Sequence, residues 1–151
     1  MKLNIFFMIK LKKLTRNNYF SVVSLDAGDN GKYVSPNSET ISYAFMFDDI
    51  SNLLVIYNND NVIGIIFARG KMNERIFINR FMIDKKYQGK GYGKKSLLMA
   101  LKYFTNKYKT NKIYITSSNP IAIKLYETLG FVKTGKKYRH EFELKLLYNL
   151  L

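Results

Sequence analysis

The sequence reads QGKGYG at residues 88–93, between a predicted strand that ends near Ile83 and a predicted helix that begins near Gly93. A strand, a glycine-rich turn and a helix in this order direct free backbone N–H groups and the positive end of a helix dipole at an anion. Glycine is needed because the backbone must approach its ligand closely, in part at positive φ. The stretch therefore predicts a binding loop for a phosphate group.

Two common phosphate-binding motifs do not fit this loop. A P-loop needs a glycine at position 88 and Ser or Thr after Gly93-Lys94, whereas the chain has Gln88 and Lys95 there. The dinucleotide fingerprint needs a third glycine at position 94, which is Lys94, and it belongs early in a βαβ unit. What remains is the pattern Gln-x-x-Gly-x-Gly.

Before this loop, the hydrophobic pattern predicts strands and short helices. Alternating apolar residues predict a first strand over residues 3–11, with one buried face. Weak helical spacing follows at residues 19–25, and a helix is expected after the candidate N-caps Asn37 and Ser38. Three β-rich runs joined by polar turns then predict an antiparallel succession of strands over residues 53–57, 62–69 and 75–83.

After the loop, the pattern changes to a helix from Gly93 with its apolar residues on one face. A short strand is expected over residues 113–116. Asn119 and Pro120 then start a second helix, as N-cap and first residue, and Gly130 ends it. Two closing strands are expected over residues 131–132 and 140–147. This order of elements is that of a mixed α/β protein built around one sheet.

Length and composition bound the class of protein. With 151 residues, the chain has the size of one domain, so we expect a single folded unit over residues 1–151. The chain contains no cysteine and one histidine, which excludes thiolate metal sites, cysteine nucleophiles and histidine-rich metal sites. That histidine, His140, is expected to be structural or exposed. The apolar stretch over residues 5–9 is too short to span a membrane, so we expect a cytoplasmic protein with no membrane partner.

The net charge of +14 is distributed unevenly. Residues 85–112 hold nine lysines and no acid, whereas residues 21–84 hold five basic and eight acidic residues. The cationic segment suits an anionic partner. A basic nucleic-acid-binding module is a rival interpretation, and it requires lysines interleaved with exposed aromatics on one sheet face. Because the glycines form a phosphate loop instead, we expect no nucleic-acid partner.

A second segment, NPIAIKLYETLGF at residues 119–131, sharpens the interpretation of the loop. Gln-x-x-Gly-x-Gly after Phe81-Met82-Ile83 resembles the acyl-CoA pyrophosphate loop of the GNAT superfamily of N-acyltransferases, and the second segment resembles that family's other CoA-contacting stretch. Within the family, the stretches Tyr33-Val34, 81–84 and 87–94 resemble bacterial spermine/spermidine N-acetyltransferases. The resemblance implies a mixed, mostly antiparallel central sheet flanked by helices, and acetyl-CoA as cosubstrate.

The resemblance also implies roles for individual residues. Tyr126 matches the family's general acid, which gives the leaving CoA thiolate a proton or a hydrogen bond. The backbone N–H of Ile83 matches the donor to the thioester oxygen, and a splay or bulge near residues 79–81 would free that donor. No metal is implied. The cofactor contacts that the resemblance assigns are Phe81, Met82, Ile83, Gln88, Gly89, Lys90, Gly91, Tyr92, Gly93, Lys94, Asn119 and Tyr126.

The general base is left open by the sequence. An amine is protonated at neutral pH, so some group must take its proton before attack. Asn79 stands where relatives often carry an acid, and an amide cannot be a base. The candidates are therefore Glu74, Asp84, Glu39 or a chain of water molecules.

The acceptor side is expected within residues 21–84, because the rest of the chain serves the cofactor. The expected reaction is direct acetyl transfer to a primary amine, with a polyamine such as spermine or spermidine favoured and an aminoglycoside or a protein or peptide amine as alternatives. A GNAT fold that binds CoA without catalysis is a further alternative, and the assembly is left open, a homodimer included. The side chains expected to receive a cationic, partly alkyl acceptor are Asp26, Asp29, Glu39, Asp48, Asp49, Tyr33, Tyr43, Phe45 and Phe77.

Overall fold

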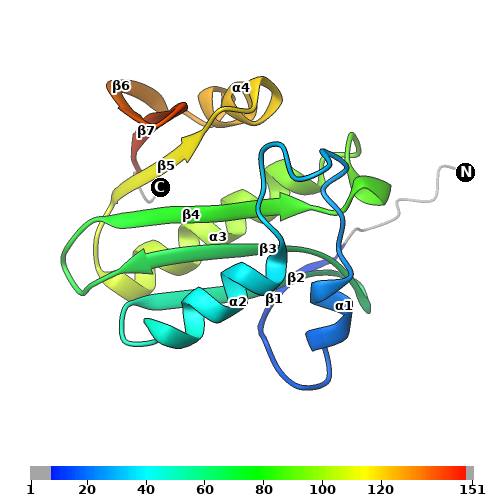
Figure 1. Cartoon of the computed structure of the whole chain (residues 1–151). Coiled ribbons are helices and arrows are strands. Elements are labelled where there is room, and N and C mark those ends of the chain that lie inside the picture. The colour runs from blue at the N-terminus through cyan, green and yellow to red at the C-terminus, as the bar shows by residue number, and fades with distance from the viewer. Residues whose placement is uncertain (1–7, 149–151) are drawn as a thin grey trace, which may run out of the picture.

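A computed structural model describes residues 8–148, which form a layered α/β structure around one sheet (Figure 1). The seven strands of this part of the chain lie in the order β1-β2-β3-β4-β5-β7-β6. Their pairings are antiparallel except that of β4 with β5, so the expected mixed, mostly antiparallel sheet is confirmed. The strands are β1 (Ile9–Lys13), β2 (Ser51–Asn58), β3 (Asn61–Gly70), β4 (Ile76–Ile83), β5 (Lys112–Ser117), β6 (Val132–Tyr138) and β7 (Glu141–Leu147).

Helices cover both faces of the sheet (Figure 1). On one face, buried residues such as Val55, Ile65 and Met82 pack with the segment that contains the first two helices. On the other face, Leu97, Leu101 and Phe104 of the long helix belong to the larger hydrophobic cluster. No helix within residues 8–148 has the length and apolar character needed to cross a bilayer. The helices are α1 (Tyr19–Val23), α2 (Asn37–Met46), the 3₁₀ turn η1 (Lys85–Tyr87), α3 (Tyr92–Tyr108) and α4 (Pro120–Thr128).

Most sequence-based expectations for these elements are confirmed. β2 and β3 form the predicted hairpin around Asn59, which adopts φ 54°, and β4 pairs antiparallel with β3. The Asn119 side chain caps α4 by accepting a hydrogen bond from the Ile121 N–H at 3.0 Å, and Pro120 is the first helical residue. Gly130 follows the helix at φ 97°.

Two strands differ from the prediction. The first strand was expected over residues 3–11; the structure gives Ile9–Lys13, and the part over residues 3–7 lies outside the described residues. The penultimate strand was expected at residues 131–132 only, but β6 extends from Val132 to Tyr138. Every residue of β6 is exposed, so its sequence carries no alternation of apolar and polar residues from which a strand could be predicted.

The centre of the sheet opens beside β4. The pairing of β4 with β5 is confined to three residue pairs and ends at Ile78 and Ile115. At the same level, the register between β3 and β4 shifts, because Phe67 pairs with Arg80 while Ala68 pairs with Ile78. Asn79 is therefore the extra residue of a β-bulge. The expected bulge and splay are confirmed, and they leave the second half of β4 without a neighbour on the β5 side.

Candidate active site

The turn between β4 and α3 is built to hold an anion with its backbone. Gly89 and Gly91 adopt φ 73° and 85°, and a Cβ added at either glycine would meet no atom within 4 Å. Gly91 is the N-cap of α3 and no side chain caps the helix, so the N–H groups of its first turn are directed at the space in front of it. The conformation and the open space fit a diphosphate.

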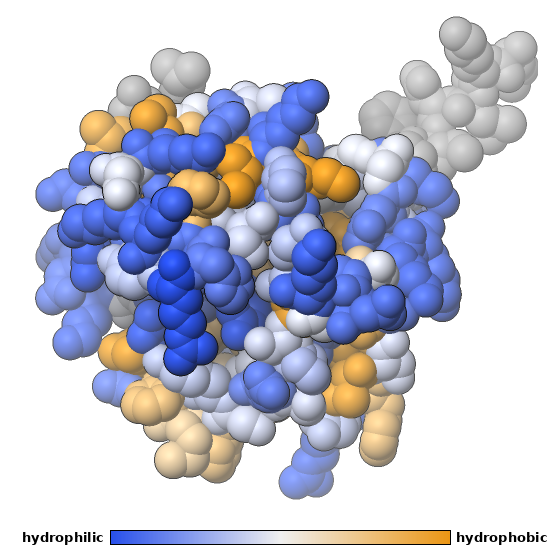
Figure 2. Space-filling model, turned by 45° about the horizontal axis from the view of Figure 1, so that its top comes forward, coloured by the Kyte–Doolittle hydropathy of each residue, from blue (hydrophilic) through white to orange (hydrophobic). Residues whose placement is uncertain are grey.

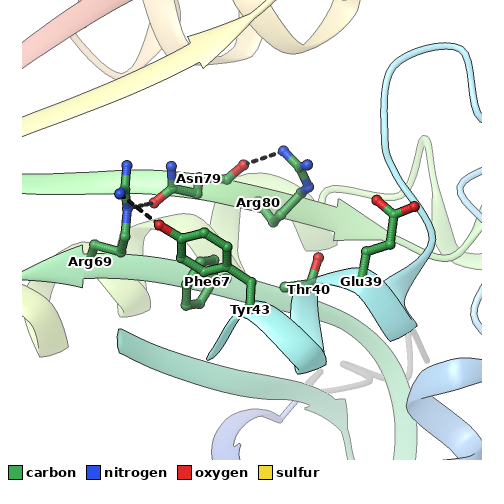
Figure 3. A pocket seen from close by; sticks show the side chains of 7 residues that line it. All are labelled: Glu39, Thr40, Tyr43, Phe67, Arg69, Asn79 and Arg80. Atoms are coloured by element: carbon green, nitrogen blue, oxygen red, sulfur yellow. Dashed lines mark hydrogen bonds between the residues drawn. The ribbon is translucent and has the colours of Figure 1, made fainter. Parts of the chain in front are cut away.

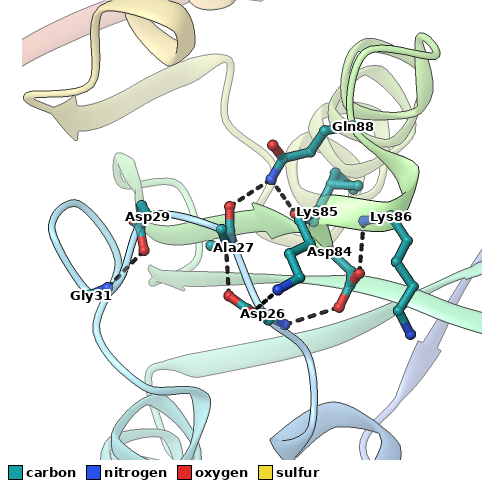
Figure 4. A network of polar contacts seen from close by, with 10 residues as sticks. Asp26, Ala27, Asp29, Gly31, Asp84, Lys85, Lys86 and Gln88 are labelled. Atoms are coloured by element: carbon teal, nitrogen blue, oxygen red, sulfur yellow. Dashed lines mark hydrogen bonds and ion pairs between the residues drawn. The ribbon is translucent and has the colours of Figure 1, made fainter.

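The side-chain amide of Gln88 stabilises this turn through hydrogen bonds within the protein. Its Nε2 atom donates hydrogen bonds of 2.8 Å to the carbonyl oxygens of Ala27 and Ile83 (Figure 4). Asp84 ties the same region together, since its carboxylate accepts from the N–H groups of Asp26 and Lys86, both at 2.9 Å. The turn is thus fixed both to the end of β4 and to the loop between α1 and α2.

A hollow of about 360 Å³ extends from this turn along the open side of β4 to α4. Figure 2 brings this end of the molecule forward and shows hydrophilic residues over much of it, with apolar residues between them. Val34 and Ala27 of the α1–α2 loop form one wall. The predicted cofactor contacts that line it are Phe81, Met82, Ile83, Gln88, Gly89, Gly91, Gly93, Lys94, Asn119 and Tyr126.

The other two predicted contacts do not line this hollow. Tyr92 is buried, and its hydroxyl accepts a hydrogen bond from Asn58 Nδ2 at 3.1 Å, so its side chain belongs to the core. The Lys90 ammonium donates to the Lys86 carbonyl oxygen at 3.2 Å. The side chains of these two residues therefore stabilise the loop and its helix.

The backbone of Ile83 faces the hollow. The Asp84 N–H donates to the Ile63 carbonyl oxygen of β3 at 2.7 Å. Since N–H directions alternate along a strand, the Ile83 N–H is turned away from β3. On that side β5 has already diverged from β4, because their pairing ends at Ile78. The Ile83 N–H is thus a donor on the open side of the splay, where the predicted role requires it.

Tyr126 is the buried side chain that reaches this hollow from α4. The residue is 4% exposed, and it also lines a smaller hollow of about 60 Å³ that shares several lining residues with the first. Burial raises the pKa of the Tyr126 hydroxyl well above its usual value, and the negative charge of Glu141 adds to this rise. The hydroxyl therefore keeps its proton at neutral pH, so it is available as a donor of a hydrogen bond or a proton and not as a base.

The smaller hollow brings in Glu141, which the sequence reasoning missed. Glu141 begins β7 and lines the hollow together with Tyr126, Thr116 and Asn79. No local signal marks this residue, because it is one of three charged residues that alternate with apolar ones along the last strand. Only the pairing of β5 with β7 brings it toward α4.

A third hollow of about 240 Å³ lies beneath α2, on the far side of β4 from α3 (Figure 3). Arg69 Nε donates to Asn79 Oδ1 at 2.8 Å and its Nη1 donates to the Tyr43 hydroxyl at 2.9 Å. Arg80 donates to the Asn79 carbonyl oxygen at 2.9 Å and to Ser35 Oγ at 3.1 Å. Hydrogen bonds between side chains of separate elements thus hold this wall.

The three candidate bases occupy different environments. Glu74 is exposed in the turn before β4 and lines none of the three hollows. Asp84 is buried, and both of its carboxylate oxygens accept the backbone N–H bonds described above. Glu39 lines the hollow beneath α2. Of the three, only Glu39 lines a hollow of the site.

Two of the five acidic side chains expected to receive the acceptor serve the protein's own structure. Asp26 pairs with Lys85 at 2.7 Å, and the hydrogen bond from Lys85 lowers the pKa of Asp26. Asp29 accepts from the N–H groups of three residues in its own loop. Asp48 and Asp49 are exposed after α2 and line none of the hollows. Only Glu39 among these five acids lines the hollow beneath α2.

The aromatic side chains expected on the acceptor side divide in the same way. Tyr33 lines the smaller hollow and Tyr43 the hollow beneath α2. Phe45 is 80% exposed, and Phe77 packs edge-on against Tyr138, so neither lines these hollows. His140 is exposed. Within the described part of the chain, no group of Asp, Glu and His is placed to hold a metal ion.

Comparison with known proteins places these features in a family. The Acetyltransferase (GNAT) family matches residues 19–131. A probable spermine N(1)-acetyltransferase of Bacillus subtilis subsp. natto is 42% identical over 66 residues, which cover 42% of this chain and 43% of that protein. The spermine/spermidine N(1)-acetyltransferase of Bacillus subtilis strain 168 is 41% identical over 66 residues with the same coverage. The chain thus matches less than half the length of these curated relatives.

Solved structures share the fold over most of the chain. A spermidine N-acetyltransferase from Vibrio cholerae, in complex with CoA and spermine, superposes with a TM-score of 0.72 at 22% identity and covers 91% of this chain and 93% of its own. PaiA N-acetyltransferase from Thermoplasma acidophilum, in complex with coenzyme A, gives 0.70 at 16% identity, with 93% and 99% covered. At these identities the likeness concerns the fold. With the family match over residues 19–131, the expectation from the two sequence segments is confirmed: this chain belongs to the GNAT family of acetyltransferases.

Proposed function

We propose that this protein is an acetyl-CoA-dependent N-acetyltransferase that passes the acetyl group directly to a primary amine. One observation carries the proposal: a single hollow connects the anion-binding turn at residues 88–93, the outward N–H of Ile83 and the hydroxyl of Tyr126. Acyl transfer from a CoA thioester requires hydrogen-bond donors to the diphosphate, a hydrogen-bond donor to the oxyanion and a donor of a proton to the leaving thiolate.

The β4–α3 turn would bind the diphosphate of the cosubstrate. The N–H groups over residues 88–94 supply several hydrogen bonds to one charged group, each worth about 1.5–3 kcal/mol. The Lys94 side chain lines the same hollow and adds a positive charge. Because α3 is anchored in the core through Leu97, Leu101 and Phe104, this turn is held in place before the ligand arrives.

Acetyl-CoA would supply the acetyl group as a thioester. The Ile83 N–H would stabilise the negative charge that develops on the carbonyl oxygen, since a fixed donor in a partly buried site costs no reorganisation. Tyr126 would give its proton to the departing sulfur. The attacking nitrogen loses its protons to solvent and, through Tyr126, to that sulfur. No covalent enzyme intermediate is needed, and the sequence has no cysteine to form one.

A polyamine such as spermine or spermidine is the acceptor that we propose first. Two curated relatives carry that activity in their names, and the second hollow is lined by apolar groups beside a carboxylate, as an alkylammonium requires. An aminoglycoside or a peptide amine is the alternative acceptor. The cytoplasmic location and the assembly of the protein stay predictions, as does the absence of a nucleic-acid partner.

The experiment that tests the function is release of free CoA thiol from acetyl-CoA with a panel of amines. We expect turnover with spermidine and spermine above that with an aminoglycoside and a peptide that has a free N-terminus. If calorimetry shows that acetyl-CoA binds but no amine of the panel is acetylated, the protein binds CoA without catalysis and the proposed activity is refuted. Absence of acetyl-CoA binding, together with a salt-dependent mobility shift of DNA, would favour the nucleic-acid module instead.

A further inference from the structure

Glu141 occupies a position that the reaction outlined above leaves unused. The residue is half-buried at the start of β7 and lines the 60 Å³ hollow next to Tyr126. Resting on the proposed function, we infer that the Glu141 carboxylate binds the reacting ammonium group of the acceptor at this place. The ligand class is a primary alkylammonium, and the hollow is its subsite.

The sheet fixes the direction of this side chain. Thr116 of β5 pairs with Glu143 of β7, and Glu141 lies two residues before Glu143, on the same face of the strand. Its Oε2 atom accepts a hydrogen bond of 2.8 Å from Thr116 Oγ1. The carboxylate is therefore held toward the end of β5, where that strand diverges from β4.

No ion pair within residues 8–148 neutralises the charge of Glu141. In residues 8–148, the ion pair present is Lys85 with Asp26, so no cation of this part of the chain is paired with Glu141. Its Oε1 accepts no hydrogen bond from these residues either. The neighbouring Glu143, by contrast, has Oε1 bonded to Thr134 at 2.8 Å and Oε2 bonded to Tyr138 at 3.0 Å. A half-buried carboxylate with an open oxygen favours a cationic ligand.

Arg80 lies on the same hollow and limits where a cation can sit. Its guanidinium donates hydrogen bonds to the Asn79 carbonyl oxygen and to Ser35 Oγ, and the residue borders the hollow beneath α2 as well. An ammonium group is repelled from that end and attracted to the Glu141 end. The charges therefore place the nitrogen beside β5 and α4 and not beside α2.

The Glu141 end of the hollow is also where the chemistry needs the nitrogen. Tyr126 lines the same hollow, and the charge of Glu141 contributes to the raised pKa of its hydroxyl, after burial. The two side chains thus lie within electrostatic reach of each other. The apolar side chains of Val34, Phe81 and Ala122 line the same space, which suits a methylene chain attached to the nitrogen.

The test measures binding of spermidine to the protein saturated with CoA, by calorimetry, for the wild type and for Glu141→Gln. Removing one partner of a charge pair in a partly buried site typically costs about 2 kcal/mol or more, so we expect spermidine affinity to fall at least about thirtyfold. Affinity for acetyl-CoA should stay within about twofold, because Glu141 lies outside the 360 Å³ hollow. Unchanged spermidine affinity would overturn the inference.

Two further variants separate charge from folding. Glu127→Gln removes the same charge from an exposed position on α4 outside the hollow, and we expect it to leave both affinities unchanged. Glu141→Asp keeps the carboxylate but shortens its reach to Thr116, and we expect spermidine affinity to fall less than in Glu141→Gln. If Glu141→Gln does not fold, as judged by its affinity for acetyl-CoA, Glu141→Asp decides: unchanged spermidine affinity with intact acetyl-CoA binding refutes the subsite.

The outcome for Glu141 is distinguishable from that for the enzyme. Because the readout is binding to the CoA complex, it does not require turnover. A wild type that binds spermidine through Glu141 but releases no CoA thiol would keep the subsite and refute catalysis. If the wild type and Glu141→Gln both turn over spermidine with the same KM, the enzyme stands and the subsite is refuted.

Discussion

The turn before α3 and the hollow beneath α2 are built from different parts of the chain. The turn uses consecutive backbone N–H groups over residues 88–94 and two glycines at positive φ. The hollow beneath α2 uses side chains from three elements, α2, β3 and β4, held by hydrogen bonds such as that of Arg69 with Asn79. The turn is thus a backbone site, whose binding groups stay the same under most substitutions except those that fill its space. The hollow beneath α2 is a side-chain site, whose binding groups change with each substitution of a lining residue.

This difference suits the two ligands of the proposed reaction. The diphosphate of acetyl-CoA is constant, and a turn anchored by a long buried helix holds it in one geometry. The acceptor varies from enzyme to enzyme, and a wall of interchangeable side chains can follow it without disturbing the turn. The splay at Asn79 separates the two places, because β4 has the 360 Å³ hollow on one side of its open half and the hollow beneath α2 on the other face.

The largest effect is expected when the backbone site is filled. Gly91→Glu places a carboxylate where the diphosphate should lie and puts a side chain at φ 85°. Loss of two charged hydrogen bonds alone costs about 3 kcal/mol, so acetyl-CoA affinity should fall at least about 100-fold by calorimetry.

Gly135→Glu is the matched control for this change. Gly135 has φ 88° and open space around it, but it lies in β6, away from the turn. The same added charge and the same backbone strain should therefore leave acetyl-CoA affinity unchanged. Equal losses in the two variants would show that strain or charge, and not the site, explains the result for Gly91→Glu.

A smaller effect is expected from Tyr126, the buried tyrosine that lines the 360 Å³ hollow. Tyr126→Phe removes the hydroxyl but keeps the ring against Phe131, whose centroid lies 5.8 Å away. General acid catalysis contributes at least about 100-fold, so kcat should fall by about that factor while the KM for acetyl-CoA changes little. Tyr114→Phe, on β5 outside this hollow, should keep full turnover, and equal turnover in Tyr126→Phe would remove the proposed acid.

The backbone site was also the part that the sequence could predict. Glycine at positive φ, a helix that starts without a side-chain cap and Asn119 bonding two residues ahead are all local properties, so short stretches encode them. The expected lining by residues 81–83 follows from the same local order of strand, turn and helix.

The side-chain site depends on contacts that no short stretch contains. Asn79 meets Arg69 only because the β3–β4 register shifts at the bulge, and Glu141 meets Thr116 only because β7 pairs with β5. Acidic residues were therefore assigned to the acceptor side by composition alone. The structure instead uses Asp26 and Asp29 for an ion pair and a loop, since a carboxylate stabilises whichever N–H groups or cations it meets.

Burial of Tyr126 can be measured through stability at alkaline pH. Its pKa is raised in the folded state by burial, so the stability contribution is complete below the unfolded value of about 10 and is lost as the pH rises above it. Between pH 8 and 10.5 the wild type should lose about 0.8 kcal/mol more than Tyr126→Phe in the free energy of unfolding. Urea titrations at the two pH values measure this difference. Equal losses in the two proteins would contradict the burial of the hydroxyl.

The smallest effect is expected at Asn79, the position where relatives often carry an acid that could serve as the general base. The Asn79 side chain accepts from Arg69 Nε at 2.8 Å, so Asn79→Asp would give a carboxylate paired with a guanidinium. Such a carboxylate is a poor proton acceptor because its pairing lowers the pKa. We expect turnover to change less than about threefold, whereas a new general base would raise it about 100-fold.

The free energy of unfolding should also show the pairing of the new carboxylate in Asn79→Asp with Arg69. A partly exposed ion pair contributes about 0.2–1 kcal/mol, so Asn79→Asp should raise the free energy of unfolding by that amount at low salt and by less at high salt. In the background Arg69→Gln, the new carboxylate is no longer neutralised and the gain in stability should vanish. A large rise in turnover in that double variant but not in Asn79→Asp would mean that Arg69 keeps the position from acting as a base. A large rise in Asn79→Asp itself would move the acceptor nitrogen from the Glu141 end of the hollow to the bulge.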